Sequence, residues 1–312
     1  MIAELLTIVA PVFLLLGVGY CAARFGGFER TTIDGVMRFA QGFAVPCLLF
    51  LSVYRMDLAV QFSVDLLVVF YTGALVCFTL GIVGARVLFK RRPGEAVAVG
   101  FAALFANSVL LGLPITERAY GADALVANFV IVSLHAPVCY LVGMVTMEMA
   151  RADGRSLGET LSTALISLVR TPIMIGLALG FAANLLNITL VEPLEAAVDM
   201  MAKAALPVAL FGLGAVLSRY RLGERLGEAG MVIVLSLLIH PAIIAALDAQ
   251  VMSLTDAQLK SAIVTAAMAP GINAYLFANL YKRAEDTAAT AVLLGTAASV
   301  FTASAWLWWL GL

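Results

Sequence analysis

The chain alternates long apolar stretches with short polar ones. Ten apolar stretches have about the 20-residue length that crosses a bilayer as a helix. They are residues 4–24, 33–54, 64–88, 96–119, 123–149, 160–186, 193–218, 229–251, 260–281 and 287–311. The pattern predicts an all-α integral membrane protein with ten transmembrane helices and no soluble domain.

Composition supports a membrane protein and narrows the function. Charged residues make up 12% of the 312 residues, against about 25% in soluble domains. The net charge is -1 and no basic stripe carries interleaved aromatic residues, so no nucleic acid partner is expected. The four cysteines all lie inside apolar stretches without paired spacing, which predicts buried thiols and no metal site.

A polar segment at residues 151–159 divides the chain into two halves of five helices, residues 1–150 and 160–312. The loops after the first, third, fifth, seventh and ninth stretches carry 13 of the 19 Lys and Arg residues, and the other loops and tails carry three. By the positive-inside rule, these odd loops are cytoplasmic and both termini lie outside.

The halves resemble each other at an offset of 161 residues. Residues 44–50, Ala-Val-Pro-Cys-Leu-Leu-Phe, align with residues 205–211, Ala-Leu-Pro-Val-Ala-Leu-Phe. Because each half has five helices, the second half must enter the membrane upside down. The sequence therefore predicts an inverted repeat, a frequent plan among secondary transporters.

Two of the predicted helices are interrupted at their centres by residues that disfavour a helix. The interruptions occupy one register of the repeat, because Val109 aligns with Pro270 at the same offset. Their polar or helix-breaking residues are Asn107, Ser108, Gly112 and Pro114 in the fourth stretch and Pro270, Gly271 and Asn273 in the ninth.

Interrupted helices survive in a bilayer only where the freed backbone groups face protein or a wet cavity. A half-helix that begins there presents free amides and a partial positive charge, which favour a carboxylate. Asn side chains can donate to carboxylate oxygens. We therefore expect the seven residues to bind the substrate at mid-membrane, the alternative being two structural kinks whose Asn side chains bond to neighbouring carbonyls.

Four titratable residues inside the predicted spans are further candidates. Lys203 is costly near the bilayer centre and has Asp199 one turn earlier on the same helical face. A structural ion pair and a role in substrate attraction or coupling both remain open. His135 and His240 each precede a proline within a span. Either histidine could couple proton movement to transport, or could be a buried histidine bonded within the core.

Three segments carry a family resemblance. They are Leu-Gly-Leu-Pro at 111–114, Ala-Asn-Leu-Tyr at 278–281 downstream of Pro270, and Leu-Pro-Val-Ala-Leu-Phe-Gly-Leu-Gly-Ala-Val-Leu at 206–217. In these the chain resembles the auxin efflux carrier family, including its bacterial malonate and malate carriers and the plant PIN-FORMED proteins. One departure is Arg170-Thr-Pro172, where Asn-Pro is more usual in that family.

The resemblance implies a fold like that of bile acid transporters. Helices 1, 2, 6 and 7 would form a scaffold, and helices 3–5 and 8–10 a core in which helices 4 and 9 cross. The positions that match the family's crossover motif are Asn107, Pro114, Pro270 and Asn273. The implied substrates are small organic anions such as malonate, malate or an auxin-like acid.

We therefore predict a secondary transporter of a small carboxylate that works by alternating access at the crossover. A sodium-coupled bile-acid-like symporter is the alternative, and a membrane-embedded enzyme a remote one, since no HExxH, GxGD or GxSxG pattern occurs. No cofactor is expected, and coupling to protons or to sodium is open. The expected partners are the carboxylate and the lipid bilayer of a bacterial inner membrane, with a homodimer through the scaffold helices also open.

Overall fold

The computed structural model describes residues 2–58, 62–121, 124–151, 169–250 and 253–312. Within these residues the regular elements are helices, and one isolated antiparallel bridge joins Ala106 to Pro270. The chain separates into two compact units, each made of segments distant in sequence. Unit 1 comprises residues 1–9, 63–165 and 220–312, and unit 2 comprises residues 10–62 and 166–219.

Seven helical segments of the described part are long and apolar enough to cross a membrane. They coincide with the predicted spans 1, 2, 3, 5, 7, 8 and 10. The fourth and ninth predicted spans are each divided into two short helices, as the interruptions predict. The predicted linker and the beginning of the sixth span fall at residues 152–168, outside the described residues, so the prediction of ten spans is shown only for its seven long members. Arg170, placed within the sixth span from sequence, precedes the helix that begins at Pro172 and is exposed.

Unit 2 contains most of α1 (Ile2–Phe25) together with the helices that precede α5 and the pair α10 and α11. In chain order these are α2 (Arg30–Phe39), the π-helical turn η1 (Ala40–Ala44), α3 (Val45–Tyr54), α10 (Pro172–Leu185) and α11 (Glu192–Leu217).

Close backbone approach joins the helices of unit 2. A Cβ atom added at Gly176 of α10 would lie 2.5 Å from the carbonyl oxygen of Pro46 on α3, and one at Gly214 of α11 would meet the carbonyl oxygen of Leu16 on α1. Small residues let transmembrane helices pack at this distance. In a lipid environment the hydrophobic effect does not drive helices together, so close van der Waals packing stabilises the contact. Larger side chains at these two glycines would force the helices apart.

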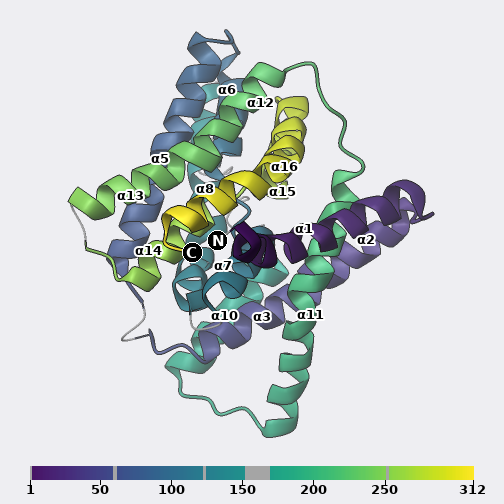
Figure 1. Ribbon diagram of the computed structural model, residues 1–312, viewed down its shortest axis with the longest axis vertical. Coiled ribbons are helices and arrows are strands. Elements are labelled where there is room, and N and C mark those ends of the chain that lie inside the picture. Colours follow the sequence, from purple (N-terminus) through teal and green to yellow (C-terminus); the bar gives the residue numbers. More distant parts are fainter. Residues whose placement is uncertain (1, 59–61, 122–123, 152–168, 251–252) are drawn as a thin grey trace. The chain divides into compact units, whose positions relative to one another are not determined.

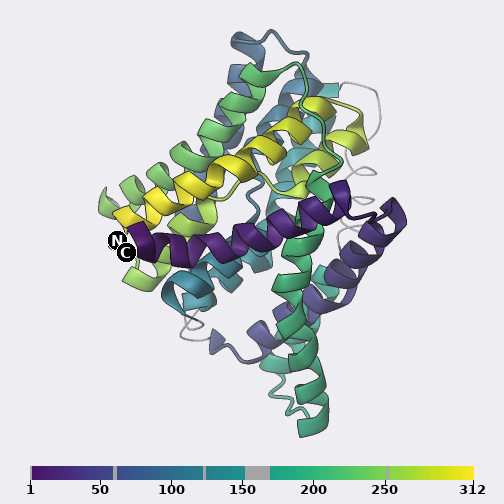
Figure 2. The same cartoon turned by 45° about the vertical axis from the view of Figure 1, so that its right-hand side comes forward.

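Unit 1 contains the remaining helices. Several of them are labelled in Figure 1, and Figure 2 gives a second view of the same ribbon. The remaining helices are α5 (Val64–Val87), α6 (Pro93–Leu104), the π-helical turn η2 (Ser108–Gly112), α7 (Leu113–Tyr120), α8 (Leu125–Arg151), α12 (Leu226–Val234), the π-helical turn η4 (Leu235–Ile239), α13 (His240–Gln250), α14 (Asp256–Ala266), α15 (Ile272–Tyr281) and α16 (Glu285–Trp309).

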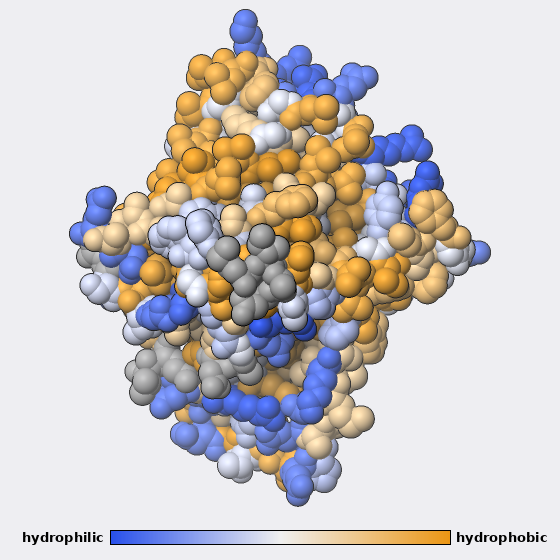
Figure 3. Space-filling model, in the orientation of Figure 1, coloured by the Kyte–Doolittle hydropathy of each residue, from blue (hydrophilic) through white to orange (hydrophobic). Residues whose placement is uncertain are grey.

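Large apolar side chains are exposed on helices of both units. Examples are Leu14 of α1, Leu179 of α10, Leu80 of α5 and Phe301 of α16, with exposed fractions between 44% and 77%. Figure 3 shows broad apolar areas on the viewed face. Exposed apolar area of this extent suits contact with lipid rather than water.

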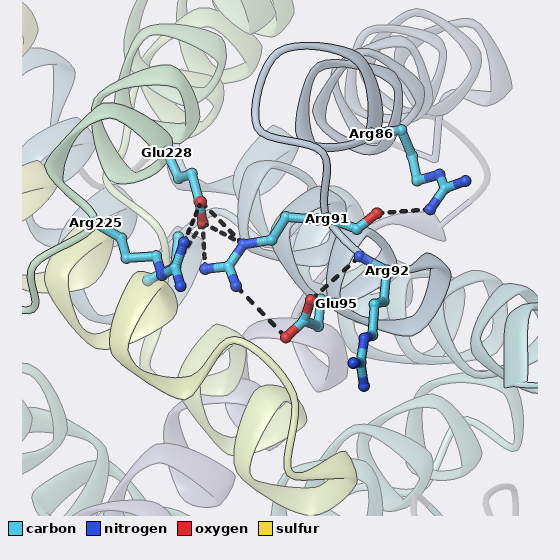
Figure 4. A network of polar contacts seen from close by, with 7 residues as sticks. Arg86, Arg91, Arg92, Glu95, Arg225 and Glu228 are labelled. Carbon is cyan, nitrogen blue, oxygen red and sulfur yellow. Dashed lines mark hydrogen bonds and ion pairs between the residues drawn. The ribbon is translucent and has the colours of Figure 1, made fainter.

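A charged network joins three helix beginnings in unit 1 (Figure 4). The guanidinium of Arg91, just before α6, donates from Nε and Nη2 to the carboxylate of Glu228 in the first turn of α12 at 2.8–3.0 Å. The same carboxylate accepts from the hydroxyl of Thr287 in the first turn of α16 at 3.0 Å and lies 3.6 Å from Arg225. The loops after the third, seventh and ninth predicted spans therefore meet at one end of unit 1.

Candidate functional site

The first helix interruption lies between α6 and α7. Helix α6 ends at Leu104, and the chain then runs in a non-helical conformation to Asn107. The carbonyl of Asn107 accepts from the N–H groups of Leu111 and Gly112 at 3.2 and 3.1 Å, and its Oδ1 atom accepts from the N–H of Leu110 at 3.3 Å. Asn107 therefore caps the second half of the interrupted helix with both its backbone and its side chain.

The wide π-helical turn η2 is explained by the hydrogen bonding of Gly112 and Pro114. Gly112 bonds five residues back to Asn107 instead of four, and Pro114, early in α7, has no N–H to offer the preceding turn. π-helical turns within helices are frequent at functional sites. The polar and helix-breaking residues identified from sequence thus produce a local widening at mid-helix.

The second interruption lies between α14 and α15. Helix α14 ends at Ala266, and α15 begins at Ile272 with the extended Gly271 as its N-cap residue, which makes no side-chain capping bond. Pro270 lacks an N–H and cannot continue the helix. The N–H of Ala274 bonds to the carbonyl of Gly271 at 2.9 Å. The amides of Ile272 and Asn273 have no acceptor within their own helix.

The two interruptions are bonded directly to each other. The N–H of Asn107 donates to the carbonyl of Ala269 at 2.8 Å, and the N–H of Gly271 donates to the carbonyl of Phe105 at 2.9 Å. These bonds form the antiparallel bridge between Ala106 and Pro270. Segments more than 160 positions apart in the sequence therefore form one structural element, which we call the crossover (residues 105–112 and 267–273).

Helix ends of both polarities meet at the crossover. Helices α6 and α14 end there, so their carbonyl ends bring partial negative charge, while η2 and α15 begin there and bring partial positive charge. The N–H groups of Ser108 and Leu110 at the start of η2 are already bonded, so it is α15 that offers amides without an acceptor in their own helix. An anion is favoured at the two N-terminal ends. Anion affinity at this place needs no charged side chain.

Asn107 and Asn273 supply side-chain amides at the crossover. Asn107 is only 5% exposed, and its Nδ2 atom is buried without a hydrogen-bond partner. Leaving such a donor unpaired costs about 1–3 kcal/mol. Asn273 is half-buried, and its Oδ1 atom accepts from the hydroxyl of Tyr140 at 3.2 Å. The unpaired donor of Asn107 is available to an acceptor that enters the site.

The other residues predicted for this site lie in the crossover, except Pro114, which lies two residues beyond it in α7. The remaining members are buried: Ser108, Gly112, Pro114, Pro270 and Gly271. The structure thus brings six of the seven predicted residues into the crossover, from both halves of the chain, with Pro114 next to it in α7.

Helix α8 contributes polar contacts that were not predicted from the sequence. Besides Tyr140, it carries Asn128, which is fully buried and donates from Nδ2 to the hydroxyls of Thr116 on α7 at 3.2 Å and Thr265 on α14 at 2.6 Å. The Oδ1 atom of Asn128 is buried without a partner. Asn128 was detectable as a polar residue in an apolar span, but its two partners lie on other helices, one of them 137 residues away.

The two candidate histidines have different surroundings. Both rings are buried, with exposed fractions of 2% for His135 and 1% for His240. The Nε2 atom of His135 lies 3.2 Å from the carbonyl oxygen of Ala106 in the crossover, whereas that of His240 lies 3.1 Å from the carbonyl oxygen of Phe70 in α5. The structure brings only His135 to the predicted site.

Lys203 and Asp199 lie in unit 2 and are paired with each other. Lys203 Nζ is 2.7 Å from Asp199 Oδ2, and its side chain is 76% exposed. Asp199 also lies 3.5 Å from Arg55, which in turn bonds to Glu195 at 2.6 Å. The hydrogen bond to Glu195 is the main cause that raises the pKa of Arg55. These four residues form a chain of alternating charges along the first half of α11.

The sequence profile of a family described as membrane transport protein matches residues 5–307. A putative malonate transporter of Rhizobium meliloti (strain 1021) is 24% identical over 96% of this chain and 94% of its own length.

Two further relatives cover nearly the whole chain. The uncharacterized transporter YfdV of Escherichia coli (strain K12) is 22% identical over 96% of this chain and 95% of its own. A probable auxin efflux carrier component 5a of Oryza sativa subsp. japonica is 24% identical over 93% and 92%. The chain therefore belongs to this family of membrane transport proteins, the auxin efflux carrier family, and is a transporter and not an enzyme.

Proposed function

We propose that the chain is a secondary transporter of a small organic anion, a carboxylate such as malonate, malate or an auxin-like acid, that binds at the crossover. The observation that carries this proposal is the buried, unpaired Nδ2 donor of Asn107 beside two helix N-terminal ends. A carboxylate oxygen would accept from that donor and from the free amides of α15. The names of the malonate transporter and auxin efflux carrier relatives agree with a carboxylate substrate.

The proposed mechanism is alternating access between two parts of the chain. Unit 1, which contains the whole crossover, would be the substrate-carrying core, and unit 2 the scaffold. We further propose ten spans arranged as two inverted repeats in a bacterial inner membrane, with both termini outside. The hydrogen-bonded pairing of the two interruptions, which share one register at the 161-residue offset, supports the repeat.

A sodium-coupled symporter is a second candidate, favoured by one observation. The buried Oδ1 atom of Asn128 has no partner, and two threonine hydroxyls lie on the other atom of the same amide. Oxygen atoms of this kind suit a hard cation. Coupling to protons or to sodium is therefore part of the test.

The test is transport by purified protein in proteoliposomes. Vesicles preloaded with unlabelled malonate, malate or indole-3-acetate would be mixed with the labelled acid from pH 5.5 to 7.5, in sodium or potassium buffer. We expect protein-dependent exchange of at least one of these acids, abolished by excess unlabelled acid. Flux that requires sodium would select the symporter. Folded protein that exchanges none of a broad carboxylate panel would contradict both candidates.

A further inference from the structure

His135 holds the residue next to Asn107 in place. The carbonyl oxygen of Ala106 receives two donors: Nε2 of His135 at 3.2 Å and the N–H of Ser108 at 2.9 Å. Ala106 is also the residue of the bridge that faces Pro270. The histidine thus connects α8 to the centre of the crossover.

The hydrogen bonds assign one protonation form to this ring. A carbonyl oxygen only accepts, so Nε2 of His135 must carry the proton. Nδ1 lies 3.8 Å from Sγ of Cys139, one turn along α8, whose thiol can donate to it. Both nitrogens of a neutral imidazole are then in use.

Aromatic rings fix the orientation of the imidazole. Phe105 meets it edge-on with centroids 4.7 Å apart, Phe70 does so at 5.9 Å, and Tyr71 stacks on it at 6.3 Å. The titratable groups near it are Tyr71 of α5, Cys139 of α8 and His240 of α13. None of these is a carboxylate that would stabilise an imidazolium ion.

We propose that His135, as a neutral Nε2–H donor, is the positioning residue of the anion site and not a proton carrier. Its bond to the Ala106 carbonyl fixes the backbone from which Asn107 presents its Nδ2 donor. This inference rests on the proposed function, because it assumes that a carboxylate binds at the crossover.

The first experiment compares carboxylate affinity and transport in three variants at position 135. Gln carries its amide nitrogen as many bonds from Cβ as Nε2 lies in histidine, Asn falls short of that point, and Phe has no donor. We expect His135→Gln to retain wild-type KM for malonate, or for whichever acid the wild type exchanges, and His135→Asn and His135→Phe to raise KM about tenfold with little change in maximal rate. The pH profile of His135→Gln should match that of the wild type.

The matched control is His240→Asn, because His240 is equally buried and bonds to a carbonyl away from the crossover. It should lower the melting temperature and leave KM unchanged. Equal KM in the wild type and folded His135→Phe, equal losses in the Gln and Asn variants, or a displaced pH profile in His135→Gln would each overturn the positioning role. Failure of the wild type itself to bind or exchange any carboxylate would instead overturn the proposed function.

A second measurement needs no substrate. The chain contains only two histidines, so ¹⁵N-histidine labelling of His240→Gln leaves the signal of His135 alone. We expect the ¹⁵N shifts of a neutral ring protonated at Nε2, constant from pH 5.5 to 8. Titration of this signal in that range, or the Nδ1-protonated form, would contradict the proposal even if the variants behaved as expected.

Discussion

The polar groups of the crossover in unit 1 and the charged groups along α11 in unit 2 differ in charge, in burial and in whether they are paired. The crossover has no charged side chain among its residues 105–112 and 267–273, is largely buried, and contains the unpaired donor of Asn107. The second group consists of four charged residues, Glu195, Arg55, Asp199 and Lys203. These are more exposed and pair with one another. Paired charges have little left to offer a ligand, whereas an unpaired buried amide N–H can still donate to one.

A buried ion pair in unit 1 allows stability to be changed separately from substrate binding. Glu228→Gln would remove one charge from the contact with Arg91, whose side chains are 3% and 11% exposed. Arg91 would then keep only its 3.5 Å contact with Glu95. Breaking a buried pair costs up to about 3–5 kcal/mol. We expect the largest loss of melting temperature of all the variants, measured by thermal denaturation in detergent.

The control for Glu228→Gln is Asp256→Asn, which breaks the exposed pair with Lys260. That change should cost under about 1 kcal/mol. Equal melting temperatures for the two variants would show that the network in Figure 4 does not stabilise unit 1.

Among the substitutions to alanine, Asn107→Ala should produce the largest loss of substrate affinity. It removes both the donor and the cap of the π-helical turn, so we expect KM to rise about tenfold and stability to fall by about 1 kcal/mol. Exchange assays in proteoliposomes and thermal denaturation measure the two effects. Normal transport by this variant would place the binding site elsewhere.

Asn273→Ala should have a smaller effect on affinity. Asn273 is half-buried and its Oδ1 atom is already bonded to Tyr140, so we expect KM to rise about threefold, consistent with one hydrogen bond at a partly wet site. Tyr140→Phe serves as the control, since it frees Asn273 without removing it. A tenfold loss in Tyr140→Phe with none in Asn273→Ala would show that Tyr140 is the group that meets the substrate.

Lys203→Ala should change transport least. The ammonium group of Lys203 lies in unit 2 and is exposed. When this group is removed, Asp199 keeps its contact with Arg55. We expect KM to stay within about twofold of the wild type, as for other exposed ion pairs, with Lys203→Arg as the charge-preserving control. A large rise in KM or a displaced pH profile that Lys203→Arg restores would give this residue the role in attraction or coupling that its sequence position allowed.

The sequence predicts the places where helices break better than it predicts what surrounds the breaks. Pro114, Pro270 and the neighbouring glycines act locally, so the interruptions could be located without a structure. The contacts of Asn128, His135 and Tyr140 could not, because their partners lie on distant segments.

Long-range pairing also limits what sequence spacing can say about charges. Asp34 has Arg38 one turn later in the sequence, yet in the structure it bonds to Arg219, 185 residues away, at 2.7 Å. Lys203 does pair with Asp199 at the predicted spacing. Spacing along one helix predicts contacts within that helix, and packing between helices decides the rest.

Equilibrium binding to the wild type and to Asn107→Asp shows whether the carboxylate binds at the crossover. Asp retains the oxygen that caps the turn but replaces the Nδ2 donor with a negative charge. With labelled malonate, malate and indole-3-acetate at pH 7, we expect saturable binding of at least one acid to the wild type and at least about tenfold weaker binding to folded Asn107→Asp. Equal affinity of the two proteins for that acid would contradict binding at the crossover.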